Sequence, residues 1–141
     1  MSPDAKAQVL GRIKQFASCT EADLRLLATA CDEVRVPEGT LIAEQGALCH
    51  ELVIVVSGLL ETCRSGRAAR LGPGDTVGWD AMQNRGANAA TVRTVSAAVL
   101  LVMSHRQFLA ATSVDQPAAR ECIMPAPPAI ERRKETATHI R

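Results

Sequence analysis

The sequence predicts one domain that consists mainly of antiparallel β-strands with flanking helices. Short β-prone segments follow one another from residue 34 to residue 103. Turn residues separate them roughly every 8–12 residues, a spacing typical of sandwiches and barrels. With 141 residues and 47% hydrophobic content, the chain is large enough for one core. Among these architectures we expect a jelly roll, also described as a double-stranded β-helix.

The first part of the chain is expected to be helical. Residues 4–16 place apolar side chains at helical spacing, which predicts one amphipathic helix, weakened by Gly11. Thr20 and Asp23 form a capping-box pattern, which predicts the start of a second helix. Residues 1–30 are therefore interpreted as N-terminal helices of the same domain.

The β-prone segments that follow are short, and glycine or proline bounds most of them. A brief strand should also lead into Gly78, and Ser104 with Gln107 is a second capping-box pattern that predicts a helix after the last strand. We expect this β-roll and its following helix to occupy residues 31–113. The main strand segments are residues 34–36, 40–42, 52–56, 59–62, 68–71, 90–95 and 97–103.

The last 28 residues, 114–141, contain four prolines and a polar end, which predicts a partly disordered tail. This segment is also too short for a winged helix-turn-helix, so we do not expect direct DNA binding. A formal net charge of +1 likewise gives no electrostatic reason to expect nucleic acid or a membrane as partner.

Targeting signals are not visible in the sequence. No apolar run approaches the length of a membrane span, and the N-terminus lacks a basic region followed by an apolar core. We therefore expect a cytoplasmic protein. The five cysteines are scattered without CxxC spacing, so we interpret them as small, mostly buried hydrophobic residues. A disulfide framework or a zinc site is not expected.

The strongest functional signal is the segment of residues 71–92, LGPGDTVGWDAMQNRGANAATV. A turn leads through a short strand to Gly78, and the residues after it can form one or two helical turns. The first turn of a helix has N–H groups without internal partners. Such a group of donors is suited to an anion, in particular a phosphate.

This segment resembles the phosphate-binding cassette of the cyclic-nucleotide-binding domain family. The family includes the sensor module of catabolite-activator-type regulators and of protein kinase A regulatory subunits. The resemblance covers residues 8–113 and includes the sequence VIVVSG at residues 53–58. It implies a jelly-roll fold and a ligand of the cyclic AMP type. Five turn glycines match the family's spacing, namely Gly39, Gly46, Gly58, Gly74 and Gly78.

Two side chains depart from the family's cassette. Members usually present F-G-E-L-A and then R-[SA]-A, in which Glu accepts a hydrogen bond from the ribose and Arg pairs with the phosphate. Here Trp79 stands at the Glu position and Asn88 at the Arg position. A Trp brings a large apolar body toward the expected place of the sugar. Loss of the Arg–phosphate contact costs roughly 2–5 kcal/mol, which weakens binding by roughly 30- to several-thousand-fold.

The leading hypothesis is a stand-alone regulatory or interaction module with weak or no conventional cyclic AMP binding. It would have no catalytic residue, metal or cofactor, its partner would be an unidentified protein, and it could be a monomer or a homodimer. If the cassette does bind a ligand, the resemblance implies that the contacts come from Gly78, Trp79, Asp80, Ala81, Met82, Asn88, Ala89 and Ala90.

The alternative hypothesis is a true cyclic AMP sensor. The phosphate would then contact backbone amides at residues 78–82 and at Ala89, with Arg85 or Arg93 as a substitute cation. Asp80 could replace the ribose acceptor, although adjacent residues normally point in different directions.

A less favoured alternative is a cupin-like metal enzyme. His50 and Glu51 lie in a suitable region, but no HxH motif accompanies them. Cys49, His50 and Glu51 are also the residue types of a nucleophilic site, but adjacency along a strand does not bring side chains together.

Overall fold

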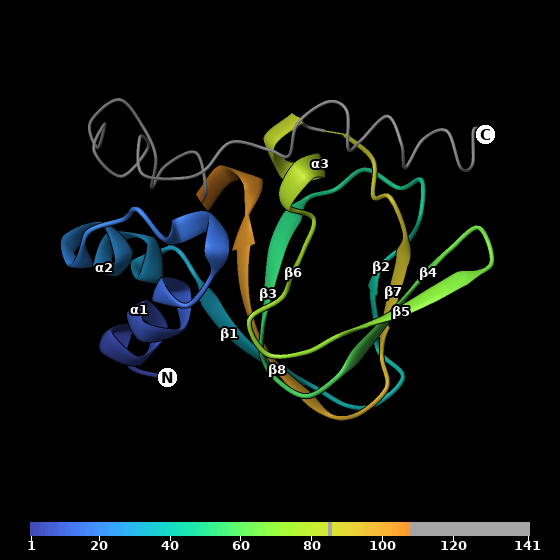
Figure 1. The fold of residues 1–141 in the computed structure, drawn as a ribbon, viewed down its shortest axis with the longest axis horizontal. Helices are drawn as coiled ribbons and strands as arrows, with labels where there is room; N and C mark the ends of the chain where they lie inside the picture. The colour runs from blue at the N-terminus through green and yellow to red at the C-terminus, as the bar shows by residue number, and fades with distance from the viewer. Residues whose placement is uncertain (85, 108–141) are drawn as a thin grey trace.

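The computed structural model describes residues 1–84 and 86–107. These residues form two four-stranded antiparallel sheets that face each other, with helices packed on one side (Figure 1). The jelly-roll prediction is confirmed. The first sheet has the order β1 (Asp32–Val36), β8 (Ala98–Ser104), β3 (Glu51–Ser57), β6 (Thr76–Val77), and the second has the order β2 (Leu41–Ala43), β7 (Thr91–Thr94), β4 (Leu60–Arg64), β5 (Arg67–Leu71).

The N-terminal helices differ in one respect from the sequence-based prediction. Helix α1 (Pro3–Gly11) ends at its glycine, and a separate 3-10 helix, η1 (Lys14–Phe16), follows. The prediction of one helix over residues 4–16 is therefore wrong. Glycine has low helix propensity, and the chain becomes extended at Ile13, with φ −80° and ψ 130°.

Helix α2 (Glu21–Thr29) begins with the predicted capping box. The Asp23 N–H donates to the Thr20 hydroxyl and the Thr20 N–H donates to the Asp23 carboxylate, both at 3.1 Å. The second predicted box is also formed, because the Ser104 N–H donates to the Gln107 side chain at 2.7 Å and the Gln107 N–H donates to the Ser104 hydroxyl at 3.0 Å. The rest of that predicted helix, and the predicted tail over residues 114–141, lie outside the described residues. The domain boundaries stay predictions.

The core has two parts because the first sheet is buried on both faces. Successive residues of β3 alternate between them, which explains its continuous apolar run. The helix-side cluster lies between this sheet and the helices and includes Leu10, Ile13, Phe16, Leu27, Leu52, Ile54, Trp79, Met82, Leu101 and Met103. The barrel cluster lies between the two sheets and consists of Val53, Val55, Leu60, Val77, Val92, Ala98 and Leu100.

All five turn glycines that match the family have positive φ values, between +84° and +97°. At Gly58 a side chain is also excluded sterically, because a Cβ atom would lie 2.6 Å from the Ala97 carbonyl oxygen. At Gly78 a Cβ would lie 3.0 Å from both the Cys49 Sγ and the Glu51 carbonyl oxygen. Gly58 therefore requires glycine for space as well as for backbone conformation, whereas at Gly78 the neighbours would have to give by a few tenths of an ångström.

The cysteines agree only in part with the expectation of buried hydrophobic residues. Cys31 and Cys49 are buried thiols, whereas Cys63 is exposed on β4. Cys19 is disulfide-bonded, which the scattered spacing did not predict, because pairing cannot be deduced from sequence separation.

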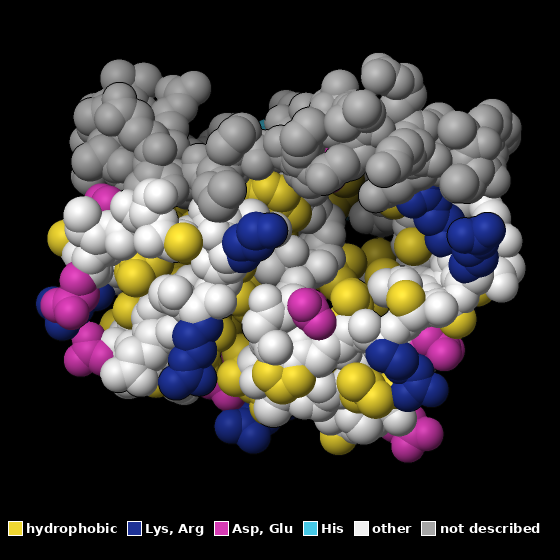
Figure 2. Space-filling model, in the orientation of Figure 1, with side chains coloured by type: hydrophobic (Ala, Val, Ile, Leu, Met, Phe, Trp, Pro, Cys, Tyr) yellow, Lys and Arg dark blue, Asp and Glu magenta, His cyan; other side chains and the backbone are white. Residues whose placement is uncertain are grey.

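The surface shown in Figure 2 carries basic and acidic side chains interspersed with each other, in line with the near-zero net charge. Within the described ranges, no helix has the length and apolar character needed to cross a membrane.

Candidate ligand-binding site

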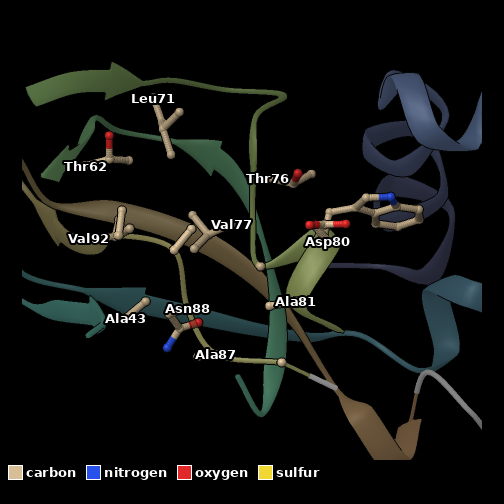
Figure 3. Close-up of a pocket in the computed structure, with 15 residues that line it drawn as sticks. Ala43, Thr62, Leu71, Thr76, Val77, Asp80, Ala81, Ala87, Asn88 and Val92 are labelled. Carbon is tan, nitrogen blue, oxygen red and sulfur yellow. The ribbon is translucent and has the colours of Figure 1, made fainter. Parts of the chain in front are cut away.

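A cavity of about 470 Å³ lies against the inner face of the second sheet, beside β6 and helix α3 (Trp79–Asn84) (Figure 3). This volume lies within the range of small-molecule sites. The cavity has one apolar wall and a few polar side chains. The apolar wall consists of Ala43, Leu71, Val77 and Val92, and the polar side chains are those of Thr62, Thr76, Asp80 and Asn88.

The register of three adjacent strands positions one wall of the cavity. Val92 on β7 pairs with Thr62 on β4 and with Ala43 on β2, so these three side chains lie next to one another. The following residue, Arg93, is exposed and lies on the opposite face of the sheet, where it pairs with Glu61. Arg93 therefore does not line the cavity, contrary to the hypothesis that it supplies a cation there.

Trp79 is among the residues that line the cavity, but its ring packs in the helix-side cluster. It is 5% exposed and packs edge-on against Phe16, with ring centroids 5.5 Å apart and an interplanar angle of 82°. The sequence alone leaves open whether Trp79 fills the pocket or points outward; in the structure its ring is buried in the core. The reason is the packing surface that the N-terminal helices provide for the indole ring, which no local sequence signal reports.

The next residue, Asp80, also lines the cavity. It lies in the first turn of α3, is half-buried, and is labelled with the other lining residues in Figure 3. Asp80 thus belongs to the cavity lining, while the Trp79 ring belongs to the core. A carboxylate does face this cavity, but from the position after the one that the family motif indicates.

Asn88, in the segment before β7, forms hydrogen bonds with the loop after β2. Its side-chain Nδ2 donates to the Glu44 carbonyl oxygen at 3.2 Å, and its backbone N–H donates to the Ala47 carbonyl oxygen at 2.8 Å. The Gly46 N–H in turn donates to the Asn88 carbonyl oxygen at 3.0 Å. Figure 3 shows the amide nitrogen turned away from the labelled Ala81 and the amide oxygen turned toward it. The Asn88 side chain thus presents an acceptor on the cavity side.

One of the predicted backbone donors is already used within the protein, because the Met82 N–H donates to the Gly78 carbonyl oxygen at 2.7 Å. The Gly86 N–H, which was not among the predicted donors, donates to the Ala81 carbonyl oxygen at 2.9 Å. The Met82 side chain is buried in the helix-side cluster and does not line the cavity. The predicted contact residues that line it, besides Asp80 and Asn88, are Gly78, Trp79, Ala81, Ala89 and Ala90, while Arg85 lies outside the described residues.

Cys49, His50 and Glu51, the residues considered for catalysis or metal binding, help to line a second, smaller cavity of about 200 Å³. There the Cys49 thiol donates to the Glu51 carbonyl oxygen at 3.3 Å, and His50 is exposed. Burial raises the pKa of the Cys49 thiol, which is the opposite of what a nucleophilic thiolate requires. Among residues 1–84 and 86–107, no three His, Cys, Asp or Glu side chains gather as metal ligands would.

Comparison with known proteins places these features in context. A family model described as "Cyclic nucleotide-binding domain" matches residues 33–115. A comparison with curated protein sequences gave no match.

Several solved structures share the fold. The regulatory domain of Toxoplasma gondii PKA, solved with cAMP, is 28% identical with a TM-score of 0.71; the alignment covers 84% of this chain and 46% of that one. A cyclic nucleotide-binding-like protein from Brucella abortus is 21% identical with a TM-score of 0.68, covering 77% and 97%. The N-terminal domain of a transcriptional regulator from Streptomyces coelicolor A3(2) is 22% identical with a TM-score of 0.72, covering 92% of both chains.

Proposed function

Because the chain belongs to the cyclic nucleotide-binding domain family, we propose that it is a regulatory module whose cavity binds cyclic AMP weakly or not at all. The observation that carries this proposal is the charge of the cavity. Among the described residues that line it, none is Lys or Arg, the residue types that pair with a phosphate. A cyclic phosphate entering this cavity would meet no cationic side chain from these residues.

The side chain at the family's Arg position supports the same conclusion. Asn88 uses its only side-chain donor group to hold the Glu44 carbonyl oxygen. An Arg at this position would offer five N–H donors and a positive charge. Removing such a charge-assisted contact weakens phosphate binding by roughly 30- to several-thousand-fold. A regulatory role then depends on contacts with another protein, or on a ligand other than cyclic AMP.

A cyclic AMP sensor is the second candidate, and one observation favours it. The cavity is not filled by the Trp79 ring, which packs in the helix-side cluster. The sensor would need a cation from outside the described lining, and Arg85 is the proposed source. Arg93 is not proposed again, because it lies on the outer face of the sheet.

Calorimetric titration with cyclic AMP separates the two candidates. We expect the unmodified protein not to saturate in the micromolar range, and Asn88→Arg to tighten binding by at least about 30-fold, the lower end of the Arg–phosphate contribution. Asn88→Ala is the matched control, since it also removes the bond to Glu44 but adds no charge. Thermal unfolding of both variants establishes that they are folded.

Micromolar saturation of the unmodified protein would contradict the proposal. In that case Arg85→Ala identifies the substitute cation, with Arg93→Ala as a control on the outer face.

A further inference from the structure

We propose that the open edge of β5 binds an extended, acidic segment of a partner protein by strand addition. The proposal goes beyond the proposed function, because it does not depend on what the cavity binds. In strand addition, backbone hydrogen bonds supply affinity and side chains at alternate positions supply specificity. Three features of β5 point to this role, namely its backbone geometry, its exposure and its charge.

The backbone of β5 presents hydrogen-bonding groups at the edge of the second sheet. β5 is the last strand in that sheet, and within the described ranges only β4 pairs with it. A two-residue loop joins β4 and β5, so Arg64 and Arg67, which flank the loop, are a hydrogen-bonded pair. Bonded and non-bonded pairs alternate along an antiparallel ladder. The N–H and C=O groups of Ala68 and Arg70 therefore point to the open edge.

The other three sheet edges carry features that hinder strand addition. β6 is only two residues long, and β2 has three residues with an irregular register against β7. β1 lies beside the N-terminus, whose ammonium group pairs with Glu33 at 2.6 Å. Short, irregular or covered edges are the means by which proteins avoid unwanted pairing. β5 is instead five residues long and regular, and its first four residues are exposed.

The position of β5 in the molecule also makes its edge accessible. The hairpin of β4 and β5 projects from the body on the side opposite the N-terminal helices (Figure 1). Between Arg67 and Arg70 the strand carries only Ala68 and Ala69, whose small side chains leave the backbone open to an incoming strand.

The charge of β5 selects among the possible occupants. The strand has two exposed arginines, Arg67 and Arg70, and no acidic residue. Arg70 contacts Glu61 through its Nε at 3.4 Å, an exposed ion pair of the kind that contributes little. A second copy of this chain would bring two more arginines to the same edge and no acid to balance them, which disfavours self-pairing. An acidic segment would meet both arginines with the opposite charge.

The spacing of the two arginines defines the partner more closely. Residues directly opposite each other on neighbouring strands share a face of the sheet, and Arg67 and Arg70 lie on opposite faces because they are three positions apart. A matching segment has two acidic residues three positions apart, a spacing that serves either strand direction. The peptide acetyl-TEVTET-amide has this spacing and β-prone residues between the acids. The matched control is acetyl-TKVTKT-amide, which reverses the charge.

The test is an NMR titration of the ¹⁵N-labelled full chain with each peptide. We expect the acidic peptide to shift the amide signals of Ala68 and Arg70 saturably, and the lysine peptide to leave them unchanged. Arg67→Glu combined with Arg70→Glu should weaken binding of the acidic peptide by about tenfold or more and make the lysine peptide the better ligand.

A second pair of variants separates strand addition from simple attraction of charges. Ala68→Pro keeps both arginines and removes an N–H that points to the open edge rather than to β4, so it should weaken binding several-fold. Ala68→Ser keeps this N–H and should retain binding. Thermal unfolding establishes that the variants are folded; should Ala68→Pro not fold, the two peptides and the charge-reversed variant still decide the question.

Four results would overturn the inference. The first is the absence of a saturable shift with the acidic peptide up to millimolar concentration, and the second is equal binding of the two peptides. The third is undiminished binding to folded Ala68→Pro, which would show attraction of charges without strand addition. The fourth is an edge that is already occupied. A dimer in sedimentation that Ala68→Pro abolishes would assign the edge to a second copy, and protection of the Ala68 and Arg70 amides from exchange in a monomer would assign it to another part of this chain. The titration with cyclic AMP tests the proposed function separately, so the two can fail independently.

Discussion

The contact between Phe16 and Trp79 predicts a large and measurable contribution to stability. The two side chains are 1% and 5% exposed and meet in an edge-to-face arrangement at 5.5 Å. Truncation of a buried aromatic residue to Ala typically costs about 3–5 kcal/mol. We therefore expect Trp79→Ala to lower the free energy of unfolding by about this amount. Such a loss is a large share of the roughly 5–15 kcal/mol of a typical domain.

A double-mutant cycle isolates the ring–ring contact itself. Phe16→Leu and Trp79→Leu preserve much of the apolar volume, and their coupling energy should be about 0.5–1.5 kcal/mol, as found for aromatic pairs. Urea unfolding followed by circular dichroism is the suitable assay, since the Trp79 variants lose the only tryptophan.

Leu48→Ala is the control, because Leu48 is 52% exposed and its truncation should change stability by less than about 0.5 kcal/mol. If Trp79→Ala costs as little as this control, the indole does not lie in the helix-side cluster. The orientation of Asp80 would then need to be reconsidered as well.

Three further predictions concern the scaffold. In urea unfolding, Gly58→Ala should destabilise the domain by more than Gly66→Ala. Both glycines have positive φ, but only at Gly58 would the new Cβ lie 2.6 Å from a backbone atom. Equal losses of stability in the two variants would contradict this prediction. Burial raises the pKa of the Cys31 thiol from 9.0 to about 12. The thiol of the unfolded chain therefore ionises first, and the free energy of unfolding should fall as the pH rises between these two values. Cys31→Ala should abolish this pH dependence. Thr20→Ala should cost about 1 kcal/mol through loss of the cap, and Thr20→Ser should restore most of it.

Much of the fold could be predicted because its signals are local. The capping box at Thr20, the turn glycines and the short β-prone segments each specify their own structure within a few residues. Alternation along β7 is a local signal of the same kind, since it places Val92 and Arg93 on opposite faces of the strand. The alternation alone is therefore enough to exclude Arg93 from a cavity that Val92 lines.

The orientation of the cassette side chains could not be predicted in the same way. Whether the Trp79 ring enters the cavity or the core depends on the space that Phe16 and the other helix-side residues leave for an indole. Phe16 lies more than sixty positions earlier in the chain. Alignment of the motif assigned the Glu position to Trp79. Tertiary packing instead gave the cavity a carboxylate from the neighbouring residue.

The burial of Trp79 against Phe16 also determines the tryptophan fluorescence of this protein. An indole that is 5% exposed and surrounded by apolar side chains should emit at short wavelength and be protected from acrylamide quenching. Trp79 is also among the residues that line the cavity, so its emission would respond to changes on either side of helix α3. Calorimetry would monitor the occupancy of the cavity, and fluorescence the surroundings of the indole.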